Sequence, residues 1–112
     1  MQNPEMKTDP MFHLLKEGRV EEFNRRRAAG EPCDLRHADL RGTDLRGLDA
    51  RDLDLSGCYL RHADLRGLDL TRANLEGASI NSAKISGTYF PAGLSAEEIT
   101  LSLVHGTRLR YR

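Results

Sequence analysis

The sequence predicts an all-β solenoid with a helical cap at each end. From Cys33 to Ala92 the chain reads as twelve uninterrupted five-residue units, such as ADLRG and LDLSG. The central residue of every unit is apolar and most often leucine, and the residue two positions before it is Cys, Ala, Thr or Leu. Self-similarity at a fixed period is typical of stacked units that bury a core which no single unit could bury alone.

The two apolar positions of a unit lie two residues apart, so they point to the same side of a short extended segment. An amphipathic helix would instead need apolar residues three and four positions apart. Glycine recurs at the last position of the unit, where a turn is easiest without a Cβ atom. The glycines at this position are Gly42, Gly47, Gly57, Gly67, Gly77 and Gly87. The pattern therefore predicts short extended segments joined by turns, with the leucines inside.

These units resemble the pentapeptide-repeat family, whose motif is roughly A(D/N)LxX, over 60 of the 112 residues. The resemblance implies a right-handed quadrilateral β-helix with four units per coil, and therefore three coils. Residues twenty apart would then lie above one another, in four columns that begin with the centres of the first four units. Two departures from the motif share a unit, a large Leu48 and a small Ala50. Because both positions face inward, the volume lost at one is restored at the other.

We expect one domain with three parts: an N-terminal helical cap over 1–32, the repeat block over 33–92, and a C-terminal capping helix with a basic tail over 93–112. Unpaired coil edges at the ends of a solenoid need such caps. Asp9 and Pro10 are a typical helix start and predict a short helix over 11–17. A second helix is predicted over 19–29.

The C-terminal cap carries a clear start signal. Ser95 and Glu98 form a capping box, with Leu94 and Ile99 placed as the hydrophobic staple. The helix is predicted to end near His105, before Gly106. Charged and less polar residues alternate in the tail over 107–112, which predicts an extended segment with one docked side.

The charge balance of the chain limits the kinds of partner that it can attract. The chain has 17 basic and 17 acidic residues, so its formal net charge is zero and it has no general attraction to nucleic acid or to an acidic membrane. The run Arg25–Arg27 could mark a nucleic-acid patch, but its place at the end of a helix favours interaction with the helix dipole. No apolar run is long enough to span a bilayer and the first ten residues have no apolar leader, so the expected location is the cytoplasm.

The sequence contains no arrangement that predicts catalysis. His37 and His62 fall at turn positions of the repeat, and the many aspartates are repeat residues that are expected to face outward. Cys33 and Cys58 fall at small inward positions, where thiols act as apolar fillers; a disulfide or metal pair is the alternative, without a CxxC spacing to favour it. We therefore expect no enzyme activity, no cofactor and no metal site.

Function is expected on the outer surface. Arg41, Tyr59, Arg61 and His62 fall on one side of the predicted coil, and arginine and tyrosine are enriched at interface hot spots. We predict a protein–protein interaction or scaffold module that uses this face. The resemblance implies an alternative, a DNA mimic that modulates a type II topoisomerase such as DNA gyrase. A mimic needs a long acidic rod, whereas this repeat block has nine acidic and eight basic residues.

The C-terminal helix has more apolar residues than one docked stripe needs. These are Leu94, Ile99, Leu101, Leu103 and Val104. The excess can lie against the tail of the same chain or against a second copy. We predict a homodimer, with Leu103 and Val104 in the contact.

Overall fold

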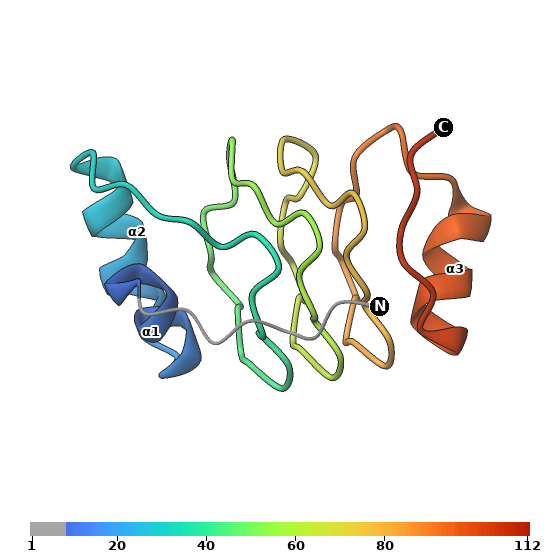
Figure 1. The fold of residues 1–112 in the computed structure, drawn as a ribbon, viewed down its shortest axis with the longest axis horizontal. Coiled ribbons are helices and arrows are strands. Elements are labelled where there is room, and N and C mark those ends of the chain that lie inside the picture. The colour runs from blue at the N-terminus through green and yellow to red at the C-terminus, as the bar shows by residue number, and fades with distance from the viewer. Residues whose placement is uncertain (1–8) are drawn as a thin grey trace.

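The computed structural model describes residues 9–112 and places the repeat block between two helical ends (Figure 1). Helices α1 (Pro10–Lys16) and α2 (Val20–Ala28) lie at one end, and α3 (Ala96–His105) lies at the other. The molecule measures 36 × 28 × 21 Å. The predicted division into three parts stays a prediction, and residues 1–8 of its N-terminal part lie outside the described residues.

The prediction of an all-β fold is wrong. Between residues 9 and 112 the structure has three α-helices and no β-strand or sheet. What links successive coils is a set of isolated parallel bridges. The physical reason is the short unit: a turn follows each inward leucine, so too few consecutive residues remain extended to form a strand. The right-handed quadrilateral β-helix that the resemblance implied is therefore replaced by a stack of turns and single bridges.

The register of twenty residues is confirmed. Each bridge joins residues twenty apart, and the series Asp39, Tyr59 and Ser79 passes through three levels of the stack. Backbone hydrogen bonds beside these bridges join the same levels of the stack: the Leu40 N–H donates to the Tyr59 carbonyl at 2.9 Å and the Leu60 N–H to the Ser79 carbonyl at 2.8 Å. Side chains at equivalent positions of neighbouring coils therefore lie next to one another.

The core runs through the centre of the stack. The leucine centres from Leu35 to Leu75 are at most 2% exposed, and Leu48 and Ala50 are both buried, as their volume exchange requires. Phe12 and Phe23 extend the core at the N-terminal end and Leu109 extends it at the C-terminal end. The interior is thus filled by the chain itself.

Polar side chains of α2 satisfy the backbone groups at the edge of the first coil. The Asn24 side chain donates to the Gly47 carbonyl and accepts from the Asp49 N–H, both at 2.9 Å. Arg27 donates to the carbonyls of Asp49 and Arg51 at 3.2 and 3.0 Å. Since a coil edge without partners would leave these groups unpaired, this helix is a functional cap.

The C-terminal helix begins as predicted, although its capping box is half formed. The Ser95 side chain accepts from the Glu98 N–H at 3.1 Å, and Gly106 ends the helix with a φ of 73°. The Glu98 carboxylate accepts instead from the Arg110 guanidinium at 3.3 Å. The basic tail therefore draws this carboxylate away from the position that a full capping box would give it.

The tail is docked on the last coil, as the alternation predicted. Leu109 is fully buried, and its backbone exchanges hydrogen bonds of 2.8 Å with the Gly77 N–H and the Ala78 carbonyl. Tyr111 follows on the same side, where its hydroxyl accepts from the Leu75 N–H at 3.1 Å. The tail thereby pairs with backbone groups of the last coil that would otherwise be open to a further coil.

Left-handed turns explain the recurrent glycine. Gly67 has a φ of 75°, a conformation that costs an L-residue about 1–2 kcal/mol. The equivalent positions His37, Asp52, His62 and Ser82 adopt a φ near 60° without being glycine. This backbone conformation therefore depends on the stacked fold and not on the presence of glycine alone.

We expect Gly67→Val to lower the free energy of unfolding by about 1–2 kcal/mol. No atom lies within 4 Å of a Cβ built on Gly67, so the cost comes from the backbone conformation alone. Chemical denaturation followed by circular dichroism measures it. Ser86→Val is the control, because Ser86 is exposed and has no positive φ. Equal stability of the two variants would contradict the argument.

Candidate functional site

The structure brings three of the four predicted face residues together. Arg41, Tyr59 and Arg61 line one groove, and the Gly42 N–H donates to the Arg61 carbonyl at 2.8 Å, which aligns the two arginines in neighbouring coils. His62 does not line this groove, although its Nε2 lies 3.4 Å from the Arg61 Nε. Three of the predicted residues therefore contribute to the lining of one groove, and the fourth, His62, lies beside it.

The C-terminal tail adds a residue that the sequence did not indicate. Arg108 places its guanidinium carbon 5.1 Å from the centre of the Tyr59 ring and donates to the Tyr59 hydroxyl at 2.6 Å. It also donates to the Gly77 carbonyl at 2.8 Å. Because Arg108 and Tyr59 are 49 residues apart, no local pattern could have linked them.

The groove is basic and has no acidic residue in its lining. Its volume is about 520 Å³, and it is lined by Arg41, Tyr59, Arg61, Ser79, Gly106, Thr107 and Arg108. Arg41 donates from Nε to Asp39 at 2.8 Å, and this hydrogen bond raises the pKa of Arg41. Across residues 9–112 neither Arg61 nor Arg108 lies within ion-pair distance of a carboxylate. The groove therefore holds cationic charge that no carboxylate of the described residues balances.

Elsewhere on the coils, a repeated Asp-x-Arg arrangement balances charge locally in five units. In the pair Asp64 and Arg66, the carboxylate accepts from the arginine backbone N–H at 3.2 Å and from its guanidinium at 2.9 and 2.7 Å. The same arrangement occurs in Asp34/Arg36, Asp39/Arg41, Asp44/Arg46 and Asp49/Arg51. Asp39 and Asp64 are nevertheless only 8% exposed. Arginine side chains cover them.

These pairs predict a loss of stability in acid. The guanidinium of Arg51 lowers the pKa of Asp49 to about 2, and that of Arg66 lowers the pKa of Asp64 to about 2. A carboxyl whose pKa is lower in the folded chain stabilises the fold above its unfolded pKa of about 3.9 and loses this effect as the pH falls toward 2.

We therefore expect a melting temperature that is constant from about pH 7 to about pH 5 and falls between about pH 4 and about pH 2. Calorimetric melts across this range measure it. The double variant Asp49→Asn/Arg51→Gln should show a shallower acid limb, because it lacks one of the pairs. An acid limb identical to that of the unchanged protein would contradict the assignment.

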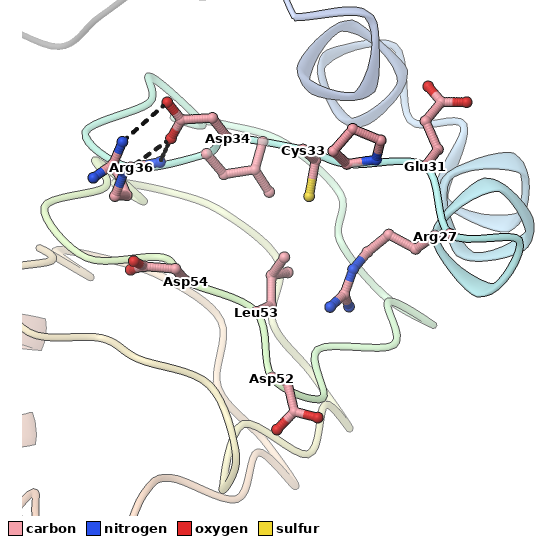
Figure 2. Close-up of a pocket in the computed structure, with 11 residues that line it drawn as sticks. Arg27, Glu31, Cys33, Asp34, Arg36, Asp52, Leu53 and Asp54 are labelled. Atoms are coloured by element: carbon pink, nitrogen blue, oxygen red, sulfur yellow. Dashed lines mark hydrogen bonds and ion pairs between the residues drawn. The ribbon is translucent and has the colours of Figure 1, made fainter.

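A second pocket of about 520 Å³ lies where the N-terminal helices meet the first coil (Figure 2). Its charged side chains are engaged with partners. Asp34 accepts from Arg36, Asp52 pairs with Arg72 at 2.7 Å, and Arg27 donates to two backbone carbonyls. This pocket therefore has less cationic charge to offer a ligand than the groove beside Tyr59.

Neither cysteine forms a disulfide. Cys58 is buried and donates to the Leu35 carbonyl at 2.8 Å, whereas Cys33 is half-buried in the second pocket, and burial raises the pKa of its thiol. Within residues 9–112, no three His, Cys, Asp or Glu side chains are grouped so as to hold a metal ion. None of the helices described is long and apolar enough to cross a membrane.

The two predicted dimer residues have different surroundings. Leu103 is half-buried against the core, and its carbonyl accepts from the Ser82 N–H at 3.0 Å. Val104 is 60% exposed and Leu101 is 40% exposed. A contact with a second copy can thus use Val104, whereas Leu103 serves the fold of its own chain.

Homodimerisation through α3 stays a prediction, and a pair of substitutions tests it. Val104→Glu is expected to convert a dimer into a folded monomer, while Leu103→Glu is expected to lower the melting temperature because it places a charge against the core. Light scattering and thermal melts measure the two effects. A mass of about 12.6 kDa for the unchanged protein at high concentration would contradict the dimer.

Comparison with known proteins agrees with the repeat. A family model described as pentapeptide repeats matches the chain in 8 copies, over residues 33–67 and 54–90. The two matched ranges overlap, cover more than half of the chain and coincide with the repeat block. No curated protein and no solved structure gives a significant match. This chain belongs to the pentapeptide-repeat family.

Proposed function

We propose that this protein is a non-catalytic interaction module that binds a partner protein in the cytoplasm. The observation that carries the proposal is the charge of Arg61 and Arg108 beside the Tyr59 ring, which no carboxylate within ion-pair distance among residues 9–112 balances. Arginine and tyrosine are the residue types most enriched at interface hot spots. Pentapeptide-repeat proteins are generally non-catalytic, which agrees with this proposal.

The rigidity of the stack supports a role in presenting a surface. The coils are linked by hydrogen bonds at every level, and α2 and the C-terminal tail cover the two backbone edges. A preformed face loses little conformational entropy when it binds, so more of the contact energy appears as affinity. A scaffold or docking role fits such a face.

The alternative of a DNA mimic acting on DNA gyrase has less support. A mimic needs unpaired acidic charge along its length, whereas the aspartates of five units accept hydrogen bonds from arginines two residues later. A gyrase supercoiling assay separates the two functions. We expect no inhibition at low micromolar protein; inhibition that disappears on charge reversal of Asp54 and Glu76 would favour the mimic.

Site-specific photo-crosslinking tests the proposed module. Thr107→p-benzoylphenylalanine puts a crosslinker on the lining of the groove and keeps its three arginines, and the same crosslinker at Arg25, an exposed residue of α2, is the control. Each variant is exposed to light in a lysate of the source cells, and the captured protein is then purified and titrated calorimetrically. We expect a protein that crosslinks from position 107, does not crosslink from position 25 and binds the purified module. Capture that is equal at both positions would contradict the proposal.

A further inference from the structure

We infer that the groove between Tyr59 and the C-terminal tail recognises a carboxylate side chain within an acidic, partly apolar peptide segment. This inference rests on the proposed function and specifies what the partner presents. It adds Arg108 and the tail to the recognition surface, which the repeat alone does not supply.

Charge complementarity is the first argument. Three guanidinium groups surround the groove, and Asp39 balances only that of Arg41. The two remaining cations, Arg61 and Arg108, have no carboxylate within ion-pair distance among residues 9–112. A carboxylate that enters the groove would accept charge-assisted hydrogen bonds, which are stronger than those between neutral groups.

Preorganisation is the second argument. Two hydrogen bonds fix the Arg108 guanidinium, one to the Gly77 carbonyl and one to the Tyr59 hydroxyl, and its central carbon lies 5.1 Å from the centre of the Tyr59 ring. Each contact uses one of its two terminal nitrogens, so further N–H groups remain able to donate. A donor that is already held in place loses less side-chain entropy when a ligand arrives.

The shape and surroundings of the groove favour a peptide over a nucleic acid. A volume of about 520 Å³ can take a few side chains, and the Tyr59 ring offers them an apolar wall. A duplex would instead need phosphate contacts spread over the surface. The neighbouring Arg46 and Arg66 are already paired with aspartates, so these two arginines do not extend the unpaired positive charge of the groove.

A titration followed by nuclear magnetic resonance tests the inference on the full chain. The probe is the peptide acetyl-Leu-Glu-Leu-Glu-amide, and the control is the same peptide with glutamine in place of glutamate. We expect the Nε–H signals of Arg61 and Arg108 to shift with the glutamate peptide, and we expect the binding to weaken when salt is raised from about 0.05 M to about 0.3 M. The glutamine peptide should bind roughly tenfold more weakly or not at all.

Variants locate the binding. Arg61→Gln should weaken the binding of the glutamate peptide by roughly tenfold, since it removes a charge-assisted contact. Arg25→Gln is the matched control, because it removes an exposed arginine at the other end of the molecule and should leave binding unchanged. Arg108→Gln should also weaken binding, but Arg61→Gln decides the result because Arg108 additionally holds the tail.

Equal binding of the two peptides, or equal binding by Arg61→Gln and Arg25→Gln, would overturn the inference. A short DNA duplex that shifts the same arginine signals at lower concentration than the peptide would overturn it in favour of a nucleic acid. Failure of the proposed function is seen separately, in crosslinking that does not depend on position. A partner that crosslinks at position 107 but binds Arg61→Gln as tightly as the unchanged protein would leave the module in place and refute the carboxylate site.

Discussion

Replacing Leu65 with alanine is expected to lower the free energy of unfolding by about 2–5 kcal/mol. Leu65 is 1% exposed and lies in the middle coil, where its N–H donates to the Lys84 carbonyl of the next coil at 2.9 Å. Its column neighbours Leu45 and Ile85 belong to the coils on either side. The loss combines the burial of the removed methyl groups with the cavity that remains, because hydrogen-bonded coils cannot collapse far toward it.

Chemical denaturation of Leu65→Ala measures this effect, and Leu101→Ala is the control. Leu101 is 40% exposed on α3, so its truncation should change the stability by less than about 0.5 kcal/mol. A Leu65→Ala variant as stable as this control would contradict the inward register of the repeat.

Replacing Leu109 with glutamate is expected to detach the C-terminal tail and to lower the stability by at least about 2 kcal/mol. Leu109 is fully buried, so the variant must either bury a carboxylate without a partner or give up the burial of the leucine, which is worth about 1.5–3 kcal/mol. Detachment also leaves the Gly77 N–H and the Ala78 carbonyl without the backbone partners that they have in the docked tail. An exposed edge of this kind promotes association between chains.

Thermal melts and size-exclusion chromatography measure both consequences. Thr107→Glu is the control, since it adds the same charge at an exposed position of the same tail. We expect only Leu109→Glu to melt earlier and to elute partly as aggregates. If both variants melt at the same temperature, the docked tail does not contribute to stability.

Local sequence signals predicted what depends on neighbouring residues. The apolar centres gave the inward face and, with the family resemblance, the register of twenty residues that the bridges confirm. Asp9 and Ser95 marked the helix starts, and both accept from backbone N–H groups as expected. These features follow from short-range geometry, which a single sequence contains.

Features that depend on distant residues were not predictable. The contact of Arg108 with Tyr59 joins the tail to the middle of the stack, and only the folded path of the chain brings them together. Asp64 is buried because Arg46 of the preceding coil covers it in addition to Arg66. The prediction of strands was wrong for a local reason. Each unit leaves too few extended residues between its turns to form a strand, so only isolated bridges are present.

The docking of a cap at each end has a consequence for how the length of this protein can change. α2 is docked through residues 47–51, and the C-terminal tail through residues 73–79, so the two caps keep a fixed phase about the long axis. Inserting a block of twenty residues between coils would add one level of about 4.8 Å and preserve this phase. Inserting a single unit of five would turn one cap by a quarter revolution and separate its side chains from their backbone partners. Insertions of whole coils are therefore expected to keep both caps docked, whereas insertions of part of a coil are expected to undock one of them.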